Sequence, residues 1–468
     1  MEVSLRDYQL NDINQCREYF RKYKNILLVG PTGSGKTVVF CWIAEQAKQK
    51  GKRVLILVHR RELLDQTSRH LDLLGVRHGL IAPKCCPTGD SLQIASVQTL
   101  IRRLGQYPAP DLIIVDECHH SAAGSWQTIL DYYPEAKLLG VTATPVRLDG
   151  KALGKKAGGY YEAIIPGPTI RKLIELKYLT QPVVFAPPSL VDLTKVKTRF
   201  GDYSKRDLAN AMDKPVIVGD AIKHYINICD GVPAIAFCAS VKHAEELALK
   251  FNEKGIPSAS IDGKLDDYTR RSRIHGLAEG KIRILTSCEI VSEGTDIPKV
   301  GAAILLRPTQ SLGLYLQQVG RVLRPYPGKK HSIILDHVGN TLRHGMPDEV
   351  RSWNLNEGVR PKKNGEVVPR FRQCEKCFFC FGLHLTECPN CKHPVTIQHR
   401  KYDEVSGNLQ QLNPDEVYKE WRAERSAYAR EVAQCRNLGD FKNIAKARGY
   451  DPKWAYIRWN IYKRKMNI

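Results

Sequence analysis

The chain has 468 residues, enough for about three domains that each bury a core of their own. Lys and Arg number 71 against 49 acidic residues, a formal net charge of +22, which suits a polyanionic partner but does not by itself identify it. Because the chain has no run of about 18 apolar residues and its start, Met1 to Asp7, lacks an apolar signal core, we expect a cytoplasmic protein without a membrane span.

The first predicted strand, Asn25–Val29, is apolar and leads directly into Gly30–Thr37, which reads Gly-Pro-Thr-Gly-Ser-Gly-Lys-Thr and opens a helix. Strand, glycine-rich loop and helix in this order form a phosphate cradle, because glycines let backbone N–H groups approach phosphate oxygens. Lys36 is expected to reach the β- and γ-phosphates, and the Thr37 hydroxyl to bind Mg²⁺. The pattern therefore predicts binding of a nucleoside triphosphate. The nucleotide-binding residues expected in this loop are Gly33, Ser34, Gly35, Lys36 and Thr37.

A wholly apolar run, Leu112–Val115, is typical of a parallel strand covered on both faces, and Asp116 and Glu117 follow it. A carboxylate at the C-terminal end of such a strand can hold Mg²⁺, which we expect of Asp116. Its neighbour Glu117 can polarise the attacking water. Together with the phosphate loop, the two carboxylates predict hydrolysis of the bound triphosphate.

Composition and periodicity divide the chain into five segments. Apolar strand runs alternate with helical stretches in residues 1–165, and a second set of such runs occupies residues 215–345, which have no phosphate loop of their own. Residues 166–214 are punctuated by Pro and Gly and are expected to connect the two units. Residues 346–411 form a linker with a cysteine cluster, and residues 412–468 a basic helical segment. Two α/β units that share one phosphate loop suggest an ATP site at their interface.

Fourteen cysteines in a chain without a secretion signal favour reduced thiols and metal ligands over disulfides. The pairs Cys374-x2-Cys377 and Cys388-x2-Cys391 have the spacing of a structural Zn²⁺ site with four thiolate ligands. A segment this small has almost no core, so the metal would supply its folding energy. Cys380 offers a competing set in which it replaces Cys374; we prefer the first set because it leaves the aromatic pair after Cys377 free to pack.

The final segment, 421–468, holds twelve Lys or Arg, four Asp or Glu and eight aromatic residues, and Pro452 stands where a helix could begin. Two interpretations stay open. The cations meet phosphates while aromatic rings stack on unpaired bases, or the aromatics form a small core and the charges face water. The cations considered for this accessory grip are Lys442, Lys446, Arg448, Lys453, Arg458 and Lys463.

The order of motifs in residues 5–325 resembles that of superfamily 2 helicases and translocases. Besides the phosphate loop and the acidic motif, the matching segments are Leu5–Gln9, Val58–Leu63, Ala95–Leu100, Val141–Pro145, Ser292–Asp296 and Gln317–Arg324. The resemblance implies an α/β fold with two tandem RecA-like parallel-sheet domains, followed here by a small zinc knuckle and a helical basic segment. It also implies ATP as the nucleotide, with Arg6 and Gln9 at the adenine and Gly294 and Asp296 as further nucleotide-binding residues.

The last motif reads Gln317-x2-Gly320-Arg321-x2-Arg324, and the resemblance assigns Gln317 and both arginines to the catalytic site. The arginines also have a physical role of their own. A cation supplied across the gap between two domains can neutralise charge on the transferring phosphoryl group when the domains close. Hydrolysis would then be linked to domain motion.

The acidic motif reads Asp-Glu-Cys-His, closer to the Asp-Glu-x-His branch than to the Asp-Glu-Ala-Asp RNA helicases. The layout resembles bacteriophage-type and RadD-like repair helicases at Thr169–Ile174, Arg307–Thr309 and Ile334–Asn340, and in the cysteine pairs. This implies an ATP-dependent DNA helicase or translocase in replication, recombination or repair. We expect a monomer in a bacterial or phage-infected cell that acts on single-stranded, forked or branched DNA, with a replication or repair protein as a further partner. The alternatives are an RNA helicase, or a DNA-binding ATP switch that recruits a partner.

Overall fold

The structure is a computed structural model. It describes residues 4–121, 124–147, 151–186, 198–199, 202–204, 208, 221–229, 231–288, 297–356, 371–374, 376–382, 385–394, 427–428, 430–448 and 452–466. Two compact units are formed, by residues 1–396 and 397–468. Among the described residues, no helix is long and apolar enough to cross a membrane.

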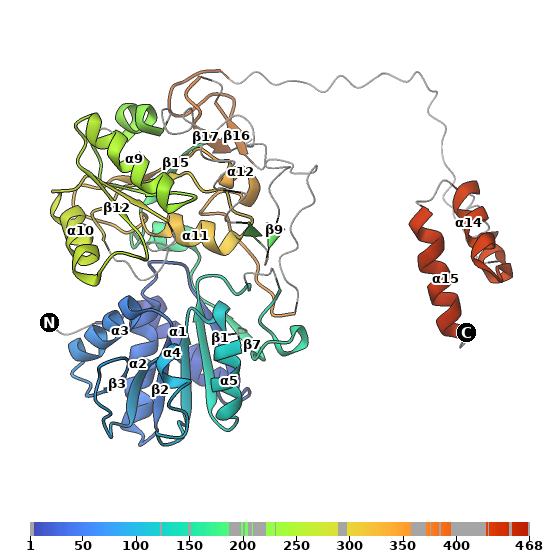
Figure 1. The fold of residues 1–468 in the computed structure, drawn as a ribbon, viewed down its shortest axis with the longest axis horizontal. Coiled ribbons are helices and arrows are strands. Elements are labelled where there is room, and N and C mark those ends of the chain that lie inside the picture. Colours follow the sequence, from blue (N-terminus) through green and yellow to red (C-terminus); the bar gives the residue numbers. More distant parts are fainter. Residues whose placement is uncertain are drawn as a thin grey trace. The chain divides into compact units, whose positions relative to one another are not determined.

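The first α/β domain is built on a sheet in which seven strands are described, all parallel (Figure 1). In spatial order they are β3 (Gly79–Ile81), β4 (Leu92–Ser96), β2 (Val54–Val58), β5 (Leu112–Asp116), β6 (Lys137–Thr142), β1 (Asn25–Val29) and β7 (Ala163–Pro166). Alternate strand residues enter two separate cores, as a sheet covered on both faces requires. One core contains α1 (Asp7–Tyr19), α2 (Lys36–Gln49) and α3 (Arg61–Leu73); the other contains α4 (Val97–Leu100) and α5 (Gly124–Tyr132).

The second α/β domain has a parallel sheet of six described strands. Their order is β12 (Ser258–Ile261), β13 (Ile284–Ser287), β11 (Ala234–Phe237), β14 (Ala302–Leu305), β15 (His331–Asp336) and β8 (Gln181–Phe185). Helix α9 (Val241–Glu253) and the short π-helix η3 (Tyr225–Cys229) bury side chains on one face. Residues of α6 (Ile170–Glu175), α10 (Asp267–Glu279) and α11 (Leu312–Gly320) are buried on the other. The predicted fold class, two parallel-sheet α/β domains, is confirmed.

The residues of β8 were expected to belong to the connecting segment, because Gln181-Pro182 is typical of a turn. The structure instead makes it the edge strand of the second sheet, with Pro182 opposite Ser332 of β15. A proline is tolerated there because an edge strand pairs on one side only. The second sheet therefore uses a strand that precedes the next strand of that sheet, β11, by some fifty positions.

The chain passes from the first domain to the second within two or three residues. The Gly167 backbone N–H donates to the Val29 carbonyl at the end of β1 (2.7 Å). Thr169 then caps α6, where its side chain accepts a hydrogen bond from the Lys172 N–H, and Leu173 of that helix is buried in the core of the second domain. The connection proper is thus very short.

The chain also returns to the first domain after α12 (Asn340–His344). The Arg351 guanidinium donates to the carbonyls of Met346 (2.8 Å) and Glu349 (2.9 Å), which keeps this turn with the second domain. Four residues later Leu355 is buried in a core of the first domain, and its carbonyl accepts from the Gly154 N–H (2.9 Å). Residues 353–355 are therefore a strap that fastens the end of the second domain to the first.

A hairpin of β16 (Phe371–Gln373) and β17 (Cys380–Gly382) follows and packs on β8. The Ala186 N–H donates to the Phe378 carbonyl (3.3 Å), and the Phe185 and Phe379 rings meet edge to face at 5.7 Å. Cys380 is 3% exposed and belongs to the core of the second domain. The cysteine-rich segment is thus attached to the second domain.

The second unit contains α14 (Leu438–Ala447) and α15 (Pro452–Met466), so a helix begins at Pro452 as its position suggests. Phe441 and Ala455 are buried between the helices, and Trp454, Trp459 and Tyr462 pack against them. Arg448 makes a two-point contact with the Glu431 carboxylate (2.8 and 3.0 Å) that ties the preceding helical turn to α14. These contacts give the unit a small core of its own.

Candidate active site

The phosphate loop lies where the sequence predicts it, between β1 and α2. Gly33 and Gly35 have φ of +88° and +77°, a backbone conformation that favours glycine. The loop directs the N-terminus of α2, with its unpaired N–H groups, toward the space where phosphates bind. Lys36 is the first residue of that helix, and its Nζ donates to the Pro31 carbonyl (3.3 Å) across the loop.

The residues expected at the adenine, Arg6 and Gln9, lie at the start of α1. The Gln9 side chain accepts from the Arg6 N–H (3.0 Å), and the Tyr8 hydroxyl donates to the Ser34 carbonyl of the phosphate loop (2.7 Å). The Arg6 guanidinium lies 4.0 Å from the centre of the Tyr178 ring, which belongs to the second domain between α6 and β8. The Arg6 guanidinium also donates to the Tyr8 hydroxyl (3.0 Å), so Tyr8 joins Arg6 to the phosphate loop.

Asp116 ends β5 and Glu117 follows in a strained left-handed conformation with φ of +49°, which is uncommon for a residue with a side chain. Both carboxylates are buried, and the Glu117 N–H donates to Asp116 Oδ1 (3.0 Å). Burial, together with the Glu117 charge, raises the pKa of Asp116 above its ordinary value. Such a carboxylate is stabilised by a nearby cation, which fits a site for Mg²⁺ held by Asp116 and Thr37.

The pKa of Lys36 is affected by every other charged group that the sequence analysis assigns to catalysis. Burial lowers its pKa; Glu117 and Asp116 act in the opposite direction, and Arg321 and Arg324 lower it further. Lys36 therefore interacts electrostatically with both carboxylates of its own domain and with both arginines of the second domain.

Close packing brings the arginine segment against the phosphate loop. A Cβ built on Gly33 would lie 3.7 Å from Arg324 Cγ, and one built on Gly320 would lie 2.5 Å from Thr32 Cβ. Gln317 and Arg321 are buried at 3% and 7% exposure. Gly294 and Asp296, the other residues expected in the second domain's share of the site, lie outside the described residues.

A chain of polar contacts runs from Glu117 toward the second domain. His119 Nδ1 lies 3.4 Å from Glu117 Oε2 and 3.2 Å from the Thr142 hydroxyl, which in turn donates to the Thr144 carbonyl (3.1 Å). A Cβ on Gly313 of α11 would lie 2.8 Å from Thr144 Oγ1. Thr142 and Thr144 belong to the Val141–Pro145 motif, which therefore links the carboxylates to α11.

Sequence reasoning gave no role to His120 and Trp126, because no motif surrounds them. The structure packs the His120 ring between those of His119 (4.2 Å between ring centres) and His59 (4.6 Å), with both pairs of rings tilted, and places Trp126 6.4 Å from His59. These rings connect the acidic motif to Val58–Leu63, one of the segments that match the order of helicase motifs. The available signal was the position of His120 directly after the acidic motif.

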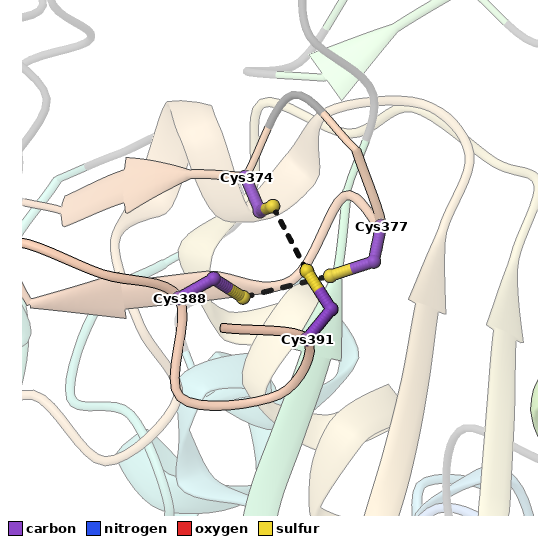
Figure 2. Close-up of side chains that lie close together, drawn as sticks. All are labelled: Cys374, Cys377, Cys388 and Cys391. Atoms are coloured by element: carbon purple, nitrogen blue, oxygen red, sulfur yellow. Dashed lines mark hydrogen bonds between the residues drawn. The ribbon is translucent and has the colours of Figure 1, made fainter. Parts of the chain in front are cut away.

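Figure 2 shows the four expected zinc ligands, Cys374, Cys377, Cys388 and Cys391, with their sulfurs converging on one point. All four Sγ atoms lie within 4.8 Å of one another, and two pairs, 374 with 391 and 377 with 388, are 3.5 Å apart. Four sulfurs at about 2.3 Å from a tetrahedral ion would be about 3.8 Å apart, so the set fits Zn²⁺, whereas a disulfide needs about 2.05 Å. Cys380, the competing ligand, is buried in the core instead.

Comparison with known proteins gives the family. Residues 2–147 match the family described as Type III restriction enzyme, res subunit, and residues 219–326 match the Helicase conserved C-terminal domain. A 51.5 kDa protein of a Lactococcus phage (isolate 7-9) is 34% identical over 375 residues, which are 80% of this chain and 79% of the phage protein. The chain belongs to the superfamily 2 DEAD/DEAH-like helicases. It is therefore an ATP-hydrolysing enzyme with nucleic-acid helicase activity.

Two further similarities agree with the family. The putative ATP-dependent helicase IRC3 of Saccharomyces cerevisiae is 32% identical over 358 residues, 72% of this chain and 51% of IRC3. The solved structure of the ATP-dependent Type ISP restriction-modification enzyme LlaBIII bound to DNA aligns with 76% of this chain and 29% of its own, at a TM-score of 0.52 and 19% identity. At that identity the likeness shows the fold.

Proposed function

We propose that this helicase is a DNA-dependent motor, which hydrolyses ATP to move along or remodel single-stranded, forked or branched DNA in replication, recombination or repair. The observation that carries the proposal is the packing of the arginine segment of the second domain against the phosphate loop of the first, where a Cβ on Gly33 would lie 3.7 Å from Arg324 Cγ. Because the site is completed from two domains, hydrolysis is linked to closure of these domains. Closure would also change the distance between a nucleic-acid contact on one domain and a nucleic-acid contact on the other.

In this proposal each side chain has a distinct role. Lys36 and the phosphate loop bind the triphosphate, and Arg6 and Gln9 hold the adenine. Thr37 and Asp116 would hold Mg²⁺, which neutralises charge on the transferring phosphoryl group. Glu117 orients and polarises the attacking water. The catalytic residues of the second domain are Gln317, Arg321 and Arg324, with Gly294 and Asp296 as nucleotide-binding residues.

Two observations favour DNA over RNA as the partner. The first domain matches a restriction-enzyme family model, and the LlaBIII structure with the same fold is bound to DNA. The net charge of +22 supports binding to a phosphate backbone of either kind. An RNA helicase is the second candidate. The family's ATP-dependent helicase activity is compatible with RNA, but no particular residue of this chain favours RNA.

The cysteine cluster supports a structural Zn²⁺ site with Cys374, Cys377, Cys388 and Cys391 as ligands. The Asn390 side-chain amide, 3.5 Å from Cys377 Sγ, would donate to that thiolate and orient it. Because the hairpin packs on β8, the metal would stabilise the edge of the second domain.

The second unit would supply an accessory grip on DNA. Lys442 and Lys446 are exposed on α14, and Tyr456 is 49% exposed with Lys442 Nζ 5.1 Å from its ring centre. Phe441, Trp454 and Tyr462 pack in the core of the unit, which favours the packing interpretation for these rings. The grip would depend on cations more than on stacking. Trp421 and Tyr450 lie outside the described residues, as does the side chain of Lys453.

The decisive experiment measures ATP turnover with single-stranded DNA, duplex DNA, forks and RNA in turn. We expect DNA to stimulate turnover and RNA to stimulate it far less. Glu117→Gln should bind ATP normally but lose hydrolysis, whereas Lys36→Ala should lose ATP binding as well. Stimulation by RNA alone would assign the chain to RNA helicases, and normal turnover by Glu117→Gln would remove the carboxylate's proposed role.

A further inference from the structure

The segment that carries the two catalytic arginines has each of its last three main-chain carbonyls held by a hydrogen-bond donor from another segment of the second domain. The Thr180 N–H donates to the Leu323 carbonyl (2.8 Å). The Lys329 ammonium donates to the Arg324 carbonyl (2.7 Å) and to that of Val322. These donors lie outside every helicase motif identified in the sequence.

Two hydroxyl groups complete the arrangement. Ser332 Oγ donates to the Val322 carbonyl, and the Thr180 hydroxyl lies 2.6 Å from Ser332 Oγ and 3.0 Å from the Leu323 carbonyl. Each hydroxyl has one proton, so that of Thr180 is shared between the serine oxygen and the carbonyl. Ser332 is fully buried and Thr180 is 8% exposed, so water does not replace these bonds when they are lost.

Thr180 has a second feature that sets it apart from an ordinary core threonine. The two residues before it, between α6 and β8, contact the phosphate loop and the residues expected at the adenine. Leu179 is 3% exposed, and its Cδ2 lies 2.9 Å from the position of a Cβ on Gly33. The Tyr178 ring meets Tyr8 edge to face at 5.5 Å and lies against Arg6. Three consecutive residues thus contact the adenine end, the phosphate loop and the arginine segment.

We propose that Thr180, Ser332 and Lys329 are positioning residues, which fix the backbone of Val322–Arg324 so that Arg321 and Arg324 face the phosphate loop. The inference rests on the proposed catalytic role of those arginines and deepens it. Long flexible arginine side chains stabilise a transition state only if their backbone is fixed, because a misplacement of about 1 Å can cost about 10²-fold in rate. Thr180 has a special place among the three, since it fixes the arginine segment relative to the residues between α6 and β8, which also contact the phosphate loop.

The test is Thr180→Val, which keeps the shape and the backbone N–H bond but removes the hydroxyl. Thr180→Ser, which restores the hydroxyl, is the conservative rescue. The matched control is Thr286→Val, since Thr286 is fully buried in the same domain and its hydroxyl donates to the Ala244 carbonyl (2.7 Å), away from the arginine segment. Steady-state ATPase with saturating DNA and thermal unfolding are measured for each variant.

We expect Thr180→Val to lower kcat about tenfold with the KM for ATP changed less than about twofold, because an interaction that acts in the transition state lowers kcat and kcat/KM together. Thr180→Ser should recover most of the rate. Thr286→Val should lose a similar amount of thermal stability and keep its kcat. Equal kcat values for Thr180→Val and Thr286→Val would overturn the inference, as would a loss in Thr180→Val that serine does not restore.

Arg324→Ala separates this inference from the proposed function. If Arg324→Ala turns over ATP at the normal rate, the arginine role itself fails and the positioning role fails with it. If Arg324→Ala is slow and Thr180→Val is normal, the positioning role alone fails. Lys329→Met is a second, independent variant: it should also lower kcat while leaving nucleotide binding intact, and a normal kcat would remove Lys329 from the set.

Discussion

Gly320→Ala is the substitution that tests most directly whether the arginine segment must press against the phosphate loop. The added Cβ would lie 2.5 Å from Thr32 Cβ, whereas carbon atoms in contact are about 3.5–4.0 Å apart. The two surfaces must therefore separate by about 1 Å or more. A displacement of that size at the reacting groups can cost about 10²-fold in kcat, or about 2.7 kcal/mol in activation free energy.

The same substitution should not destabilise the second domain. Gly320 is the last residue of α11, and replacing a helical glycine by alanine stabilises a helix by roughly 0.5–1 kcal/mol. A fall in ATPase rate with an unchanged or higher melting temperature would thus isolate the contact between the domains. The readouts are steady-state ATPase with DNA, binding of a fluorescent ATP analogue, and thermal unfolding.

Two further variants make the test specific. Gly124→Ala is the control, because a Cβ on this first residue of α5 meets no described atom within 4 Å. Thr32→Gly removes the atoms that clash, so Gly320→Ala should cost much less in the Thr32→Gly background than in the wild type. A Gly320→Ala enzyme with wild-type kcat, or equal losses in both backgrounds, would refute the reasoning.

Three other predictions concern the metal, the second unit and the response to pH. Metal analysis should find about one Zn²⁺ per chain, and Cys388→Ser/Cys391→Ser should lose it; metal retained in that variant would contradict the ligand set. Truncation after Thr396, the end of the first unit, should weaken DNA binding and make its salt dependence shallower while basal ATPase survives; an unchanged salt slope would make the second unit a protein-docking or purely structural element. Asp12 is 6% exposed, and burial raises its pKa from 3.8 to about 7. The folded state therefore binds more protons than the unfolded state between these values, so Asp12 destabilises the fold as pH rises through that window. Asp12→Asn should be more stable than the wild type above pH 7 by roughly 2 kcal/mol, after allowance for solvent screening, and no more stable at pH 4; a pH-independent difference in denaturant unfolding would contradict this.

The nucleotide site could be predicted from the sequence because its chemistry is carried by short local patterns. Lys36 and Asp116 follow apolar strands at fixed distances, and the parallel arrangement of β1 and β5 brings both strand ends to one edge of the sheet. The cysteine set could be predicted for the same reason, since each Cys-x2-Cys pair supplies two of the four ligands of a tetrahedral metal site. In each case residues a few positions apart carry the signal.

The features that the sequence did not predict depend on partners that are distant in the chain. Nothing in the surroundings of Leu355 indicates that it packs in a core of the first domain, because its partner Gly154 lies about two hundred positions earlier. The sequence around Thr180 likewise gives no sign of its role, because its hydrogen-bond partner, the Leu323 carbonyl, is far away in the chain. Pro182 was misleading for another reason: its local preference for a turn is overridden by the pairing of β8 with β15.

The strap formed by residues 353–355 has a mechanical consequence. Two rigid bodies that are joined at two points keep a single relative movement, a rotation about the line through both points. Here the points are Pro168, between the Gly167 bond to the first domain and α6, and Ser352, between Arg351 and the strap. The Arg171–Asp348 ion pair (3.8 Å) joins the segments next to these two points. In the proposed DNA motor, closure of the two domains on ATP would therefore be a rotation about this line, and a nucleic-acid contact far from the line would move farther than one close to it.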